Sequence, residues 1–391
     1  MNRVKMRLLV AGTMLGALMA GSAVIAQSGD AAPEARYVMD AGTIAGMMGQ
    51  GDNHELTLRL GSRLAPTGAP KADHFMPAGA KLGTSVPLET PTRATGELPA
   101  NFQQPKGRLL LYWGCGAKAG PGQPVVIDYS KMAKGQVPAG LFSAKVPADL
   151  GPTLANSRSF GQWPNSLKSK SISAQSSLLG QHRIAGTYSP EIAFGLNQDF
   201  MDGLRVRSNA NPDGSTGISW QGLGNATGYH AWVMGGKDMG KDGADMVWWS
   251  SSATQEFGGG LWSWLSPSTV TRLIGQKIVM PPTQTSCTVP AEVKKAAGEM
   301  MMGFVYAYGP EANFAFPERP KDPKVAWKPK WTAKVRYRSM ATFMPGMPSM
   351  SDMLSGRGQD EDGEQQQQEA PKKCKPKGLG GLLKRAAGAG C

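Results

Sequence analysis

Methionines repeat at every third residue near the carboxyl end of the chain. They are Met344, Met347, Met350 and Met353, with Met340 just upstream. Thioether sulfur is a soft ligand that selects Cu(I) over harder ions. The spacing therefore indicates a Cu(I) site over 340–353, and copper is the alternative to a protein without a cofactor. Gly, Pro and Met tracts are also typical of low-complexity linkers that bind nothing.

Tryptophans gather around the Gly-rich stretch "FGGG", which spans 257–260. They are Trp248, Trp249, Trp262 and Trp264. Aromatic rings on Gly-rich loops suit glycan stacking or a protein interface, because they give contact area at little entropic cost. We therefore expect a binding surface here, with burial of alternate rings in the core as the competing interpretation.

A basic stripe follows in "WTAKVRYRSMATF", where Arg336 and Arg338 alternate with Val335 and Tyr337. The alternation is typical of a half-buried strand. Charged residues commonly protect an exposed sheet edge from pairing with another chain. The alternative is a strip that docks on an anionic surface and assists the tryptophans, and on that interpretation Arg336 and Arg338 are binding residues.

No local motif for catalysis is present. The sequence lacks a G-x-S-x-G nucleophile elbow, and the spacing of "GCGAKAG" does not fit a dinucleotide-binding loop. The four histidines, His54, His74, His182 and His230, lack the short spacing of a zinc site, although a non-local site from His54, His74 and Asp73 stays open. We therefore expect a protein without enzymatic activity, while a site assembled from distant residues stays open.

Four cysteines allow three disulfide connectivities. Cys115 and Cys287 each sit beside an expected strand, whereas Cys374 and Cys391 share the carboxyl-terminal tail. In an oxidising compartment, pairing within each set is the simplest arrangement, with free thiols as the alternative.

The amino terminus reads as a secretory signal over 1–26, with a basic start, an apolar stretch from Leu8 to about Ala20, and small residues before Gln27. We expect an exported protein, periplasmic or associated with the outer envelope. The formal net charge of +13 indicates attraction to anionic envelope polymers or a membrane surface. No nucleic-acid-binding signature is present. The expected partners are an envelope protein or a glycan, with peripheral contact to an anionic membrane.

Strand periodicity and turn residues dominate the rest, so the predicted class is mainly β. We expect two β-sandwich-like domains. The first spans 37–150 and includes "HELTLRL", which alternates Leu56, Leu58 and Leu60. A Ser- and Lys-rich linker or loop follows over 151–182. The second domain spans 183–343, and a disordered tail covers 344–391.

Two short helical insertions are expected in the second domain. Ser266 can cap a helix that has Pro267 at its first position, and another helix starts near Pro290.

The stretch "ISWQGLGNATGYHAWVMG", residues 218–235, places Trp220 on one strand, a Gly and Asn turn, and Tyr229 on the next. This pattern resembles the fibronectin type III or immunoglobulin-like sandwich over about 209–317. The resemblance implies that Trp220 and Tyr229 are core residues of two facing sheets. The whole chain, with "YWGCG", "TSCTVP" and "YGPEANF", is similar to uncharacterised exported proteins of proteobacteria, which implies an envelope location and no particular activity. The main expectation is a non-enzymatic cell-envelope binding or structural protein, and the alternative is a periplasmic Cu(I)-binding protein.

Overall fold

The computed structural model describes residues 30–46, 51–91, 107–129, 145–146, 151–165, 172–238, 243–298 and 301–346. The expected signal peptide and all but the first three residues of the expected tail lie outside these ranges. None of the described helices is long and apolar enough to cross a membrane.

The described chain is mainly β, as the sequence predicted. The strands are β1 (Ala35–Ala45), β2 (Asn53–Ser62), β3 (Ala72–Phe75), β4 (Ser85–Pro87), β5 (Gly107–Trp113), β6 (Val125–Asp128), β7 (Ser159–Trp163), β8 (Gly180–Gly186), β9 (Ile192–Leu196), β10 (Val206–Ala210), β11 (Thr216–Trp220), β12 (Gly228–Asp238), β13 (Ala244–Ser250), β14 (Ser286–Val289), β15 (Met301–Phe316) and β16 (Trp331–Phe343). The α-helices are α2 (Pro267–Gly275) and α3 (Ala291–Ala297), and the short 3-10 turn η4 spans Gly259–Trp262.

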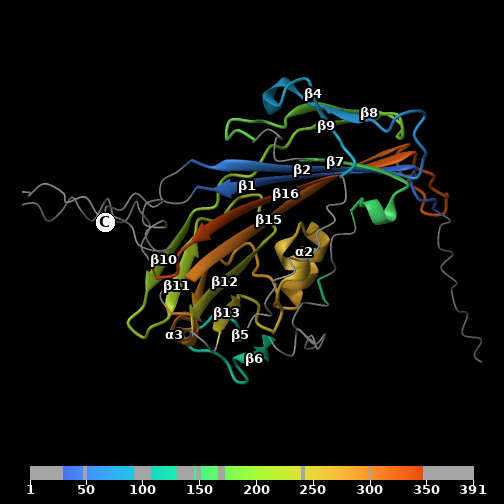
Figure 1. Ribbon diagram of the computed structural model, residues 1–391. Helices are drawn as coiled ribbons and strands as arrows, with labels where there is room; N and C mark the ends of the chain where they lie inside the picture. Colours follow the sequence, from blue (N-terminus) through green and yellow to red (C-terminus); the bar gives the residue numbers. More distant parts are fainter. Residues whose placement is uncertain are drawn as a thin grey trace, which may run out of the picture. The chain divides into compact units, whose positions relative to one another are not determined.

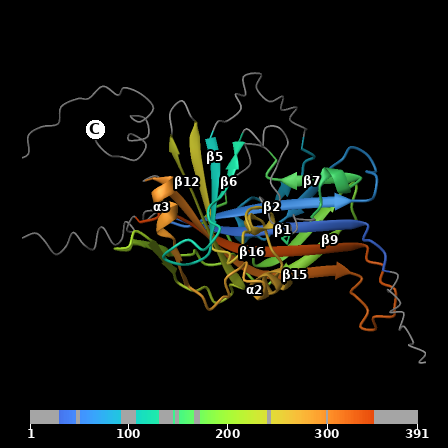
Figure 2. The same ribbon diagram turned by 90° about the horizontal axis from the view of Figure 1, so that it is seen from below.

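Nine strands form one large sheet in the order β6-β5-β13-β12-β15-β16-β1-β2-β7. Two of its pairings are parallel, β1 with β16 and β5 with β13, and both join strands far apart in the sequence. The sheet is strongly twisted, so that β5 and β12 run at a steep angle to β1 and β2 (Figure 1, Figure 2). Long-range parallel pairing is what holds the two ends of the described chain in one sheet.

This sheet draws strands from both segments predicted to be separate domains. β2, β5, β6 and all but the first two residues of β1 lie within 37–150, and β12, β13, β15 and β16 lie within 183–343. The expected linker over 151–182 contributes β7, which forms one edge of the sheet. Local periodicity indicates where a strand lies but not its partner, which explains the difference.

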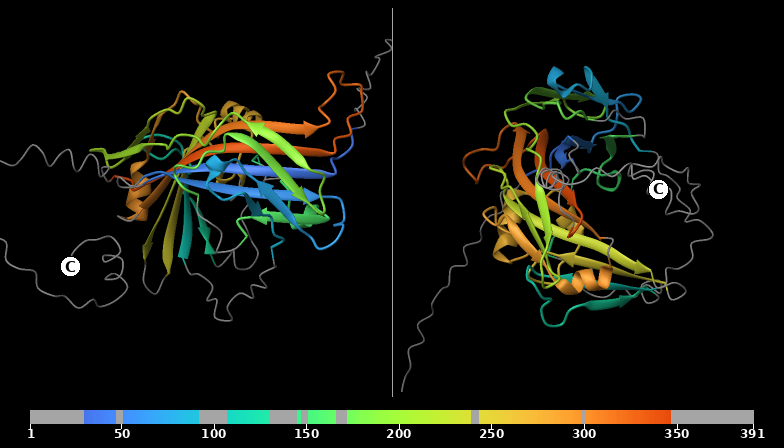
Figure 3. Two further views of the ribbon diagram at one scale, coloured as in Figure 1. Left: turned by 90° about the horizontal axis from the view of Figure 1, so that it is seen from above. Right: turned by 90° about the vertical axis from the view of Figure 1, so that its left-hand side faces the viewer.

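Two smaller sheets cover the face of the large sheet opposite α2. One is the three-stranded sheet β10-β11-β14, and the other is the four-stranded sheet β4-β3-β8-β9. The four-stranded sheet lies above β1 and β2 in Figure 1 and at the top of the right-hand view in Figure 3. On that face Leu56, Leu58 and Leu60 of β2 are buried, as their alternation predicts. Trp220 and Tyr229 are also buried, on different sheets, with ring centroids 5.4 Å apart. Their expected place in the core between two sheets is therefore confirmed.

The other face of the large sheet carries α2. Its Val270 and Leu273 belong to the same buried apolar cluster as Tyr306 and Tyr308 of β15. The helix begins as predicted, because Ser266 Oγ accepts a hydrogen bond from the Thr269 amide at 3.3 Å and Pro267 occupies the first turn. The second expected helix is α3, which starts directly after Pro290.

Candidate functional site

The four tryptophans predicted to form a binding surface do not form an exposed patch. Trp249 is fully buried, and its indole Nε1 donates to the Gly114 carbonyl at 3.0 Å. Trp262 lies against Trp232, with centroids 5.0 Å apart, and meets Trp248 edge-on at 5.6 Å. These half-buried rings leave no room for a water molecule between them. They pack against each other and against the sheet, so much of their surface is in contact with the rest of the fold.

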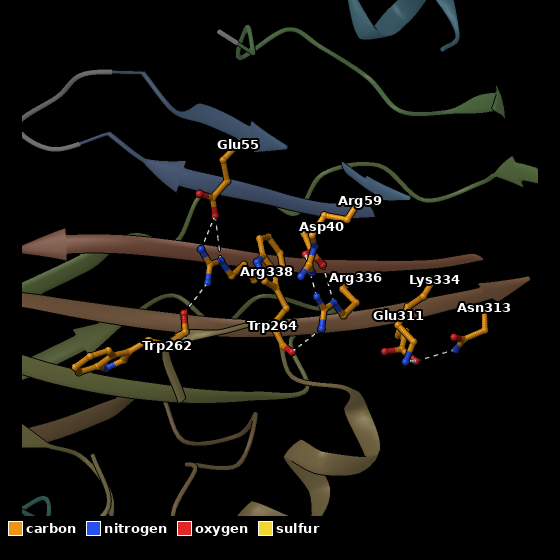
Figure 4. Close-up of polar contacts among 10 residues, drawn as sticks. All are labelled: Asp40, Glu55, Arg59, Trp262, Trp264, Glu311, Asn313, Lys334, Arg336 and Arg338. Atoms are coloured by element: carbon orange, nitrogen blue, oxygen red, sulfur yellow. Dashed lines mark hydrogen bonds and ion pairs between the residues drawn. The ribbon is translucent and has the colours of Figure 1, made fainter. Parts of the chain in front are cut away.

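The basic stripe is also internal. β16 pairs with β15 on one side and with β1 on the other, so it is not an edge strand. Arg336 makes two hydrogen bonds to Asp40, Nε to Oδ1 at 2.6 Å and Nη2 to Oδ2 at 2.9 Å (Figure 4). Arg59 of β2 contacts the same carboxylate at 2.7 Å. Asp40 thus lies buried between two guanidinium groups, and Arg336 is 6% exposed rather than part of the exposed basic strip that the sequence predicted.

Arg338 is held in a similar way. Its Nε and Nη2 donate to Glu55 Oε1 at 3.0 and 2.8 Å (Figure 4). The sheet register explains this pair, because Gly42 lies between Arg338 and Glu55 on neighbouring strands. A Cβ at Gly42 would collide with the Glu55 side chain. Glycine therefore leaves the space in which the two charged groups meet.

The same two arginines fix the loop that carries Trp262 and Trp264, called the tryptophan loop below. Arg338 Nη1 donates to the Trp262 carbonyl and Arg336 Nη1 to the Trp264 carbonyl, each at 3.0 Å (Figure 4). The Arg338 guanidinium also lies 4.1 Å from the centroid of the Trp264 ring. The predicted site residues are thus brought together, but as a network that anchors this loop to the sheet.

The predicted Cys115–Cys287 disulfide is present, with the sulfur atoms 2.02 Å apart. It joins the loop after β5 to β14, and so links the large sheet to the three-stranded sheet. Cys374 and Cys391 lie outside the described residues.

The methionine segment is described at its start. Met340 is half-buried and packs against the apolar cluster that contains Tyr306, while Met344 is exposed. Met347, Met350 and Met353 lie outside the described ranges. Among the described residues, no group of three or more His, Cys, Asp or Glu side chains is placed to hold a metal ion.

A buried chain of hydrogen bonds between histidines was not anticipated. The Tyr37 hydroxyl lies 2.6 Å from His74 Nδ1, His74 Nε2 lies 3.0 Å from His182 Nδ1, and His182 Nε2 lies 2.7 Å from the Leu178 carbonyl. A carbonyl accepts but cannot donate, so His182 must donate there, and the chain then runs in one direction from the Tyr37 hydroxyl. Burial lowers the pKa of both histidines. Both rings therefore stay neutral, and His74 is used in this chain rather than in the non-local metal site considered above.

An open groove of about 650 Å³ lies at the other end of β15 and β16. Its aromatic part comprises the rings of Phe314, Phe316, Trp327 and Trp331, and its charged groups are Glu318, Arg319 and Lys334. Phe316 is 54% exposed and stacks on Trp331, with centroids 6.3 Å apart and 23° between the ring planes. Concave sites of this size, with rings and a few polar groups, are the usual form of ligand pockets.

The loop over 317–330 that borders the groove is held by specific contacts. Trp327 Nε1 donates to the Pro317 carbonyl at 3.0 Å, and Arg319 pairs with Asp30 at 2.6 Å. The guanidinium of Arg319 lies 5.1 Å from the Trp327 ring centroid. Lys334 pairs with Glu311 at 3.1 Å (Figure 4). Its side chain is 40% exposed. These contacts tie the loop to the end of β15 and to the chain at Asp30.

The sequence reasoning missed this groove, although two signals were present. Phe314 and Phe316 alternate at the end of one strand, and Trp327 and Trp331 bracket the basic stretch "WKPKW" before the next. Hairpin closure brings these pairs together. Comparison with protein-family models, curated proteins and solved structures gave no match to this chain. The resemblance of 209–317 to a fibronectin type III or immunoglobulin-like module therefore stays a prediction.

Proposed function

We propose that this chain is a non-enzymatic, exported cell-envelope binding protein that holds its ligand in the groove at the end of β15 and β16. The observation that carries the proposal is the set of four aromatic rings lining one open groove of about 650 Å³. Aromatic side chains supply large contact area with few rotatable bonds, so they lose little entropy when a ligand binds. Export, for which the sequence over 1–26 is the support, would bring this groove into contact with envelope material.

The groove replaces the tryptophan loop as the proposed contact surface. Phe316 is largely exposed, whereas Trp249 is fully buried and Trp262 packs against Trp232. The groove is therefore favoured for its volume and for the exposed ring of Phe316, which leaves more surface for a ligand than Trp249 does.

Retention on isolated envelope material tests the proposal. Phe316→Ala should weaken retention of the purified chain by about tenfold, since a central aromatic contact is typically worth more than 1 kcal/mol. The matched control is Val126→Ala on β6, because Val126 is similarly exposed, at 51%, but lies on the strand at the far edge of the large sheet. Equal retention of the two folded variants would overturn the proposal.

A further inference from the structure

We infer that the groove takes an anionic polysaccharide, an inference that rests on the binding function proposed above. The loop over 317–330 is rich in basic side chains. It carries Arg319, Lys321, Lys324, Lys328 and Lys330 against two acidic residues, Glu318 and Asp322. All seven are exposed. A concentration of one sign of charge beside a cleft raises the local concentration of oppositely charged ligands.

Two cationic groups lie in the groove itself. Arg319 and Lys334 line it, and their side chains are 55% and 40% exposed, so each can meet a ligand while paired with its own carboxylate. A guanidinium group offers parallel N–H donors that match a carboxylate or phosphate in a two-point contact. The charged part of the ligand is therefore expected beside Arg319.

The aromatic rings of the groove provide the apolar contacts to the ligand. Phe316 keeps 54% of its surface exposed and stacks on the buried Trp331, with 23° between the ring planes, so it presents an apolar ring supported by a second ring. The negative face of an aromatic ring attracts the slightly positive C–H groups on the flat side of a sugar ring. A ligand with repeated apolar faces and regularly spaced negative charges satisfies both features, and an acidic polysaccharide has this composition.

Shape favours a polymer chain over a lipid surface. The rings of Phe314, Trp327 and Trp331 line a concave space, whereas a planar bilayer contacts side chains that project from the protein. Four prolines in the loop, Pro317, Pro320, Pro323 and Pro329, restrict its backbone. A loop whose backbone is restricted by proline and by its own contacts loses less entropy on binding.

Titration calorimetry with defined probes tests the inference. Oligogalacturonate is the acidic probe, neutral maltooligosaccharide of matched length is its control, and vesicles of phosphatidylcholine with phosphatidylglycerol represent the anionic membrane. We expect oligogalacturonate to bind, and its affinity to fall by about tenfold between about 20 and 300 mM salt, because ions screen exposed charges. Arg319→Gln should weaken binding by about tenfold, since it removes a charge-assisted contact. Arg108→Gln, at a paired arginine of similar exposure on β5, should not.

The outcomes separate this inference from the proposed function. Equal binding of the neutral probe, abolished by Phe316→Ala, would overturn the acidic ligand class and leave groove binding intact. Binding of oligogalacturonate that is insensitive to both Phe316→Ala and Arg319→Gln would place the ligand elsewhere and overturn both proposals. Binding to the vesicles without binding to oligogalacturonate, or no binding to any probe, would overturn the polysaccharide.

Discussion

Arg336 of β16 and Asp40 of β1 face each other across two parallel strands and form a buried, two-point ion pair, with side chains 8% and 1% exposed. Arg59 meets the same carboxylate from β2. One acidic group therefore holds three strands of the large sheet together.

Asp40→Asn should lower the free energy of unfolding by about 3 to 5 kcal/mol, because it leaves buried guanidinium groups without their counter-ion. Urea denaturation followed by tryptophan fluorescence measures this loss. Glu191→Gln is the control, since the Arg183–Glu191 pair is 44% and 60% exposed and should contribute less than about 1 kcal/mol. Losses of equal size in the two variants would contradict a structural role for Asp40.

The disulfide should contribute strongly to stability. Cys115 and Cys287 are 172 residues apart, and a cross-link that closes a long loop removes much of the entropy of the unfolded chain. Replacing both with serine should cost about 2 to 5 kcal/mol. Thermal unfolding of this variant, beside a Cys374→Ser and Cys391→Ser variant that keeps the Cys115–Cys287 bond, measures the effect. A melting temperature that is the same in both variants would exclude it.

Acid should destabilise the fold through its buried histidines. Burial lowers the pKa of His230 to about 4, and it also lowers the pKa of His74 and His182. Between about pH 6.5 and the folded-state pKa, the unfolded chain binds a proton that the folded chain does not. The stability due to neutral His230 is thus complete above about pH 6.5 and is lost as the pH falls toward 4, with a total of about 3 kcal/mol.

The urea midpoint measured from pH 7 to pH 4 tests this sign and its source. It should fall steadily with pH in the unmodified chain and fall less steeply in His230→Phe, which cannot be protonated there. A midpoint that rises on acidification, or an identical slope in the variant, would contradict the assignment.

Trp262→Ala should act on stability rather than on binding. The substitution removes a ring that packs against both Trp232 and Trp248, and such a loss typically costs about 3 kcal/mol or more. Differential scanning calorimetry should show a lower melting temperature, and envelope retention measured well below it should be unchanged. Lost retention without a change in melting temperature would restore the tryptophan loop as the contact surface.

Local signals in the sequence predicted local structure well. Ser266 and Pro267 marked the start of α2, and the alternation of Leu56, Leu58 and Leu60 marked β2 with its buried face. The Cys115–Cys287 pairing followed from two cysteines beside strands. Each of these predictions depends on residues close in sequence or on one simple chemical preference.

What the sequence could not provide is the choice of partner strand. Arg336 and Asp40 are joined because β16 pairs with β1 in parallel, and nothing in the alternation of either strand specifies that register. Charges on β16 therefore indicated an edge, although acidic residues on β1 and β2 neutralise them inside the sheet. The groove was missed for the same reason, since Phe316 and Trp331 meet only after β15 and β16 pair.

Site-specific photocrosslinking in intact cells tests the central claim most directly. A photoreactive amino acid at position 316 should form a covalent adduct with envelope material, while the same group at position 126, equally exposed but on β6, should not. Digestion and mass spectrometry of the adduct would identify the ligand class. Adducts of similar yield from both positions, or from position 126 alone, would contradict binding in the groove at the end of β15 and β16.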